Sequence, residues 1–73
     1  MKVCLLGGNG YLGPWVVDEL AAHGGYELRI TDLKVPRRSP HETMRVDISD
    51  LRQVRRAAAG CDAIVNCSVL RPD

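Results

Sequence analysis

The sequence contains no phenylalanine, and its only aromatic residues are Tyr11, Trp15 and Tyr26. It has no run of about 18 apolar residues, the length that a membrane-spanning helix needs. The apolar stretch at the N-terminus is far shorter than the core of a secretory signal and leads directly into glycines, which argues against a signal peptide. Ten basic residues balance nine acidic ones, so no basic excess favours nucleic-acid binding. We therefore expect neither a membrane nor a nucleic acid as a partner.

The number and spacing of the cysteines support neither a disulfide framework nor a metal site. Cys4, Cys61 and Cys67 are odd in number, and no two of them have the two-residue spacing of a metal knuckle. Cys4 and Cys67 lie in apolar runs, where a free cysteine usually packs as a small hydrophobe. His23 and His41 have no neighbouring ligands. We expect no metal and a reducing, cytoplasmic setting.

What remains is ordinary globular composition, 45% hydrophobic and 26% charged, in a chain of 73 residues with room for one domain. Apolar runs predict four strands, and periodic apolar residues predict two helices between them. The expected strands are residues 2–6, 27–32, 44–46 and 62–67, and the expected helices run from about residue 11 to 23 and from about residue 50 to 59. Residues 34–43 contain two prolines and two arginines and are expected to form a solvated loop.

Single residues predict where each helix begins and ends. Pro14 fits the first turn of the first helix, and Gly24 ends that helix. In the second helix Ser49 is the expected N-cap, Asp50 suits the first turn, and Gly60 ends it. The expected apolar faces are Leu12, Val16, Val17, Leu20 and Ala21 in the first helix, and Leu51, Val54, Ala57 and Ala58 in the second.

Strands that alternate with helices in the order β-α-β-β-α-β predict a parallel sheet with right-handed crossovers. This is the first, mononucleotide-binding half of a Rossmann-type α/β fold. In the complete fold another strand flanks the fourth one, which in residues 1–73 would present an unpaired apolar edge. We therefore expect the chain to be the N-terminal portion of a longer protein.

A glycine-rich turn joins the first strand to the first helix and carries the chemistry. Two spacings fit a dinucleotide fingerprint, one through Gly7, Gly10 and Gly13 and the other through Gly8, Gly10 and Gly13. One glycine permits the sharp turn, one lets the backbone approach a pyrophosphate, and one lets the helix pack closely on the strand. Asp32 ends the second predicted strand, where the fingerprint expects an acidic residue for the ribose. A tight turn without a ligand is the alternative, but this context favours a dinucleotide site.

The motifs LGGNGYLG, VVDELAAHG, ITDL, RVDISD and GCDAIVNCS occur in an order and spacing that resemble the N-terminal part of the NAD-dependent epimerase/dehydratase family. The resemblance to these extended short-chain dehydrogenases covers residues 1–68. It implies reversible hydride transfer at a sugar or hydroxyl carbon, commonly of a nucleotide sugar, with NAD as the cofactor. A tyrosine assisted by a lysine four residues later would act as the acid/base group.

The same resemblance assigns a cofactor role to twelve positions. The glycine turn would hold the pyrophosphate, Asp32 the ribose hydroxyls, Asp47 and Ile48 the adenine, and residues 67–69 another part of the cofactor. The implied cofactor-binding residues are Gly7, Gly10, Tyr11, Leu12, Gly13, Asp32, Leu33, Asp47, Ile48, Cys67, Ser68 and Val69.

The chain departs from the family pattern at three places. Leu6 stands where a threonine is common, so one hydroxyl near the turn is missing. The segment at residues 66–68, Asn-Cys-Ser, is more polar than usual. Trp15 and Ile30 occupy the positions four residues after the two tyrosines, so the chain contains no Tyr-x-x-x-Lys pair. We expect no catalytic residue within residues 1–73 and a small-molecule substrate bound by segments beyond them.

Several residues keep two interpretations. Arg37 and Arg38 could hold the 2′-phosphate of NADP, although the Asp32 carboxylate would repel it, so NAD is the expected cofactor. Asp47 is alternatively a turn residue before the second helix. Trp15 is either exposed or a contact with the rest of the protein or with a second subunit in a homodimer. Three arginines of the second helix, Arg52, Arg55 and Arg56, form a solvated face or an anion or partner site.

The expected function is therefore the NAD-binding portion of an epimerase/dehydratase-like oxidoreductase or isomerase. A non-catalytic dinucleotide sensor or interaction protein of the same fold is the alternative from another class. A structural domain that binds nothing is the third.

Overall fold

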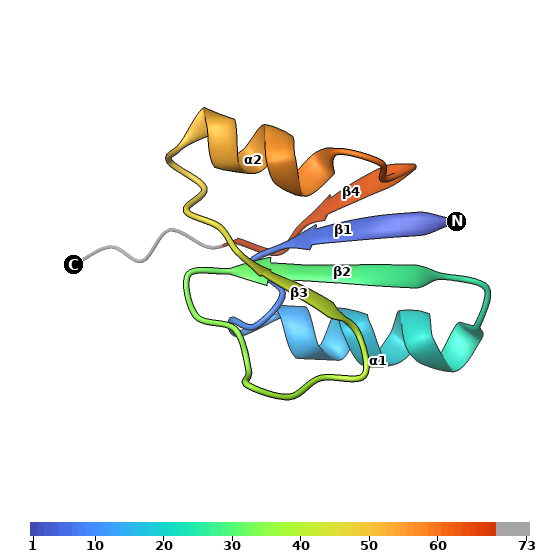
Figure 1. Ribbon diagram of the computed structural model, residues 1–73. Helices are drawn as coiled ribbons and strands as arrows, with labels where there is room; N and C mark the ends of the chain where they lie inside the picture. The colour runs from blue at the N-terminus through green and yellow to red at the C-terminus, as the bar shows by residue number, and fades with distance from the viewer. Residues whose placement is uncertain (69–73) are drawn as a thin grey trace.

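The computed structural model describes residues 1–68, in which strands and helices alternate as the sequence predicts. The elements are β1 (Lys2–Leu6), α1 (Gly13–His23), β2 (Glu27–Asp32), β3 (Glu42–Arg45), α2 (Leu51–Ala58) and β4 (Ala63–Asn66). All paired strands are parallel, and their order in the sheet is β3-β2-β1-β4. Figure 1 shows α1 on one face of this sheet and α2 on the other. The predicted α/β class with a Rossmann-type parallel sheet is confirmed.

β1 is central in the sheet, and its side chains fill a core on each face. Val3 and Leu5 pack with Val17 of α1, whereas Cys4 and Leu6 belong to the core with Ala57 of α2. Side chains alternate between the two faces of a strand, and each face here is covered by a helix. This is why the four residues that follow Lys2 in β1 are all apolar.

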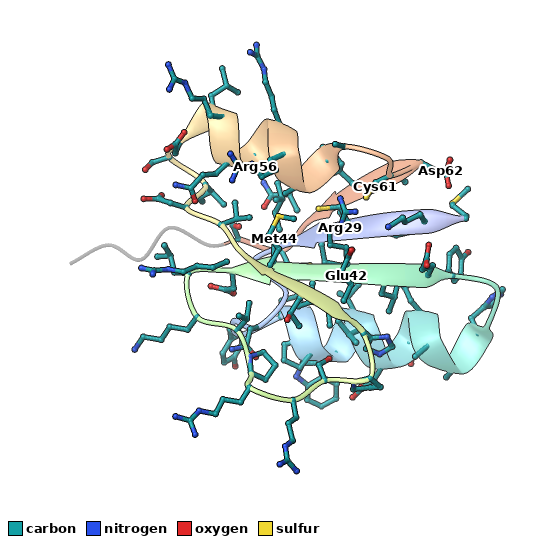
Figure 2. All side chains as sticks on the ribbon, in the orientation of Figure 1. Arg29, Glu42, Met44, Arg56, Cys61 and Asp62 are labelled. Atoms are coloured by element: carbon teal, nitrogen blue, oxygen red, sulfur yellow. The ribbon has the colours of Figure 1, made fainter. Side chains whose placement is uncertain are left out.

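The buried Arg29 of β2 joins the sheet to the C-terminal end of α2. One of its terminal nitrogens donates to the carbonyls of Ala57, at 2.6 Å, and Ala59, at 2.7 Å. Its Nε pairs with the Glu42 carboxylate of β3, and Figure 2 shows these two side chains meeting beneath α2. Glu42 compensates the buried charge of Arg29. Arg29 in turn satisfies carbonyls that the end of the helix leaves without partners. The pKa of Glu42 is held below its ordinary value chiefly by the hydrogen bond from Arg29.

The predicted start and apolar face of the first helix need correction. α1 begins at Gly13 rather than near residue 11, because Leu12 occupies the N-cap position. Pro14 lies in the first turn and Gly24 is the C-cap, both as predicted. Leu12 and Ala21 are exposed, so the face that packs on the sheet is narrower than expected and consists of Val16, Val17 and Leu20.

The predicted N-cap of the second helix is also wrong. Asp50, not Ser49, caps α2, since its Oδ1 accepts from the backbone N–H groups of Arg52 at 3.0 Å and Gln53 at 3.4 Å. Asp50 has the extended backbone that an N-cap requires. Leu51, expected on the buried face, is 61% exposed.

Two strands differ in extent from the prediction. β3 begins at Glu42, inside the predicted loop, because Glu42 pairs with Arg29, and it ends at Arg45 rather than residue 46. β4 is shorter than residues 62–67, and Ile64 is 50% exposed although a buried run was expected. β4 lies at an edge of the described sheet and has a neighbouring strand on one side only. Across residues 1–68, neither helix has both the length and the apolar character needed to cross a bilayer.

Candidate functional site

The glycine turn connects the carboxyl end of β1 to the start of α1. Its four glycines have different structural environments. Gly7 has a φ of 73°, in the left-handed region that favours glycine. A Cβ on Gly13 would lie 2.3 Å from the Gly8 carbonyl oxygen, so α1 touches the turn backbone directly. A Cβ on Gly8 would lie 2.7 Å from Ile30 of β2. Both spacings predicted from the sequence therefore describe the same closely packed turn.

Gly10 differs from the other three glycines, because little lies beside it. Its φ is not positive, and a Cβ there would meet only the Gly7 carbonyl oxygen at 3.4 Å and the Asp32 carboxylate at 3.8 Å. Packing within residues 1–68 therefore does not explain why this position lacks a side chain. The bare backbone of Gly10 instead lines a cavity.

α1 begins without a capping side chain. Leu12 at the N-cap position offers no acceptor, and the first turn contains no acidic residue. α2, in contrast, has its first N–H groups bound by Asp50. Free N–H groups and the positive end of the helix dipole make the start of α1 suited to an anion.

Asp32 ends β2 beside the turn and is fixed there by two backbone N–H groups. Its Oδ2 accepts from Asn9 at 3.1 Å, and its Oδ1 accepts from Leu33 at 2.7 Å. The Asn9 side chain donates in turn to the Lys34 carbonyl at 2.9 Å. A carboxylate has about four acceptor positions, so Asp32 retains capacity for hydroxyl donors.

A cavity of about 190 Å³ opens between the turn and the ends of β2 and β3. It brings together eight predicted site residues and one that the sequence analysis missed, Val46. The lining residues are Gly7, Gly10, Tyr11, Asp32, Leu33, Val46, Ile48, Cys67 and Ser68. Leu12, Gly13 and Asp47 are not part of the lining, and Val69 lies outside the described residues. The sequence could have indicated Val46 only by its place directly before Asp47 and Ile48, two residues already assigned to the site.

Comparison with known families decides the affiliation of this fold and turn. The model of the NAD dependent epimerase/dehydratase family matches residues 3–71. The chain belongs to this family. No curated protein sequence gave a significant match to the chain.

Solved structures of longer chains contain similar folds. A uronate dehydrogenase mutant from Agrobacterium tumefaciens, complexed with NAD, is 31% identical with a TM-score of 0.79 over 97% of this chain. UDP-N-acetylglucosamine 4-epimerase from Bacillus cereus is 23% identical with a TM-score of 0.81 over 100% of this chain, a likeness that shows the fold. The chain spans about a quarter of these proteins, 28% and 26% of their lengths.

In this family member Asp47 closes the turn before α2. Its carboxylate accepts from the backbone N–H of Ser49 at 2.9 Å and from the Ser49 hydroxyl at 2.6 Å. These hydrogen bonds lower the pKa of Asp47. Its own N–H donates to the Gln53 side chain at 2.8 Å. The geometry therefore favours the turn interpretation for the Asp47 side chain, while neighbouring Ile48 faces the cavity.

Cys67 and Ser68 follow β4 and lie against the turn. Cys67 is 4% exposed and packs in the α1 core, and burial raises the pKa of its thiol. Its N–H donates to the Leu6 carbonyl at 2.7 Å, which holds the segment beside β1. The Ser68 hydroxyl is buried and has no hydrogen-bond partner within the described part of the chain.

The arginines with two interpretations lie apart from the cavity lining. Arg37 and Arg38 are exposed in the β2–β3 loop. Neither they nor the arginines of α2 (Arg52, Arg55 and Arg56, all exposed) form an ion pair within residues 1–68. Trp15 is 74% exposed on α1.

Proposed function

We propose that this chain binds the adenosine diphosphate part of NAD in the cavity at the glycine turn. It would then be the cofactor-binding portion of an NAD-dependent epimerase/dehydratase-like oxidoreductase or isomerase. The observation that carries the proposal is the position of the Asp32 carboxylate, which ends β2 and is hydrogen-bonded to Asn9 within the glycine turn. A ribose acceptor and a phosphate-binding turn are therefore adjacent, as a dinucleotide requires.

The phosphate end of the site is supported by two features of the turn. Gly10 presents backbone without a side chain, so an anion can approach closely. The uncapped start of α1 offers N–H groups with no carboxylate in its first turn. Tyr11 and Leu12 would contribute backbone N–H groups at this point, and Gly13 keeps the helix close to the turn.

The adenosine end is supported by the side chains at the mouth of the cavity. Asp32 would accept hydrogen bonds from the ribose hydroxyls. Leu33 and Ile48 are 54% and 47% exposed, and the buried Val46 is also part of the lining. Exposed apolar side chains around a cavity suit a planar base. The cavity is smaller than the roughly 300–1,000 Å³ typical of complete ligand sites, which fits part of a dinucleotide.

We propose that the substrate of the whole protein is a nucleotide sugar or a related hydroxyl or keto compound. NAD, when bound, supplies reversible hydride transfer. The family affiliation supports an oxidoreductase of this kind, and the names of two similar structures, a uronate dehydrogenase and a UDP-N-acetylglucosamine epimerase, support a sugar-derived substrate.

A dinucleotide sensor without catalysis is the second candidate. Such a protein would use the same cavity and bind NAD without turning it over. Catalytic turnover in the presence of NAD and sugar substrates would separate the two functions.

Calorimetric titration with NAD tests the cofactor site. We expect binding by the wild-type chain and a loss of about tenfold or more in affinity for Asp32→Ala, since charge-assisted hydrogen bonds to the ribose are removed. Asp18→Ala is the matched control, because Asp18 is an exposed carboxylate on α1 outside the cavity lining. No NAD binding by the wild type, or equal effects of the two substitutions, would overturn the assignment.

A further inference from the structure

The Ser68 hydroxyl is a polar group whose burial no group among residues 1–68 compensates. Its Oγ is buried and lacks a hydrogen-bond partner among residues 1–68. The backbone N–H of Ser68 is satisfied by the Asn66 side chain at 2.9 Å, so only the hydroxyl is left over. A buried hydroxyl without a partner costs free energy that alanine would avoid. Packing among residues 1–68 therefore does not explain a serine at this position.

Ser68 stands at the phosphate end of the cavity. Its Oγ lies 2.8 Å from where a Cβ on Gly7 would be, so the side chain rests against the first residue of the turn. Ser68 also lines the cavity. Asp32 lies at the other end of the turn, 3.8 Å from the corresponding position on Gly10. A serine side chain has three staggered rotamers and its O–H rotates freely, so the hydroxyl is not fixed in one direction by a hydrogen bond.

We propose that the Ser68 hydroxyl donates a hydrogen bond to the pyrophosphate of the bound dinucleotide. This inference rests on the proposed function and adds a side-chain donor to a phosphate site otherwise built from backbone N–H groups. The hydroxyl has no partner among residues 1–68, and a phosphate oxygen would be an acceptor for it. Hydrogen bonds to charged acceptors are stronger than neutral ones, so the contact contributes to affinity.

Calorimetric titrations of the wild type and Ser68→Ala with NAD, ADP and adenosine test the contact. We expect the substitution to weaken NAD and ADP binding by about tenfold and to leave adenosine binding unchanged, because adenosine has no phosphate. Ser39→Ala is the matched control. Ser39 lies in the β2–β3 loop, where its Oγ accepts from the His41 N–H at 3.1 Å, and it is not part of the cavity lining.

Thermal unfolding gives a second readout that a purely structural serine would not produce. Without ligand, Ser68→Ala should have the same Tm as the wild type or a higher one, because an unsatisfied hydroxyl is removed. Added NAD should raise its Tm less than that of the wild type. A lowered Tm without ligand, unchanged affinity for NAD, or an equal loss for adenosine would overturn the role of Ser68 alone. A wild type that binds neither NAD nor ADP would overturn the proposed function as well.

Discussion

The backbone N–H of Asn9 donates to the Asp32 carboxylate over 3.1 Å, which ties the glycine turn to the end of β2. The two strand ends that would share one dinucleotide are thus held together before any ligand binds. A site organised in this way loses less conformational entropy on binding. Figure 1 shows that the β1–α1 turn and the end of β2 lie at the same end of the sheet, where the parallel strands finish.

The charge of Asp32 should select NAD over NADP by roughly 5- to 150-fold, which corresponds to about 1–3 kcal/mol. The carboxylate accepts from ribose hydroxyls but repels a 2′-phosphate, an effect of about 4 kcal/mol at 4 Å before salt and side-chain movement reduce it. Calorimetric titration of both cofactors against wild type and Asp32→Asn measures this preference. Asparagine retains an acceptor for the turn but not the charge. A preference that survives this substitution would contradict the role of Asp32.

Gly10→Val should abolish NAD binding and leave the fold intact. The position has no positive φ and no close neighbour, so the valine side chain enters the cavity instead of the core. Binding is measured by calorimetry and folding by circular dichroism and urea unfolding. A folded variant with unchanged affinity for NAD would remove the glycine turn from the phosphate site.

Gly13→Ala should have the opposite effect and destabilise the protein by about 1–3 kcal/mol or more. The added methyl group would lie 2.3 Å from the Gly8 carbonyl oxygen. Because it is attached to the backbone of α1 and meets the backbone of the turn, the clash is relieved only if α1 shifts. Gly10→Ala is the control, since its methyl group would meet nothing closer than 3.4 Å. Equal urea midpoints for the two alanine variants would argue against the close contact between α1 and the turn.

Stability should fall in acid partly through Glu42. Its pKa in the folded protein lies below the ordinary value of 4.5. The ionised form therefore stabilises the folded state above about pH 4.5, and this contribution is lost as the pH falls through the lower folded value. Glu42→Gln should cost on the order of 1 kcal/mol at neutral pH and flatten the acid dependence. Urea unfolding across this pH range checks both effects, with the exposed Glu19→Gln as the control.

The 73-residue chain should show no hydride transfer with sugar substrates, even when NAD is bound. Neither of its tyrosines is followed at the required spacing by a lysine. The formation of NADH, followed by its absorbance, is the measurement. Turnover that disappears in Tyr11→Phe or Tyr26→Phe would place a catalytic group within this chain.

The order of elements and the parallel sheet could be predicted because each depends on a strong local pattern. The apolar run of β1 and the periodic face of α1 arise from burial on both faces and on one face, respectively. The glycine turn and Asp32 were found because their spacing is short and their context is a strand followed by a helix. The structure brings these predicted residues together around one cavity.

Details that depend on distant partners could not be predicted. The sequence gives no sign that Arg29 is buried, because its acceptors come from Glu42, Ala57 and Ala59, which are distant along the chain. Ser49 and Asp50 are both good N-caps, and only the backbone conformation decides between them. The Ser68 hydroxyl, which has no partner in the described part of the chain, has no signature in the sequence, because burial and hydrogen bonding are properties of the fold.

The hydrogen bonds of Arg29 also bear on how the protein opens. Its acceptors lie 13, 28 and 30 residues away along the chain, so all three contacts exist only when β2, β3 and the end of α2 are assembled. α1, by contrast, contacts the sheet through Val16, Val17 and Leu20. Amide hydrogens of β2, β3 and the last turn of α2 should therefore exchange with solvent as one cooperative unit. The amides of α1 should exchange in a separate and earlier opening.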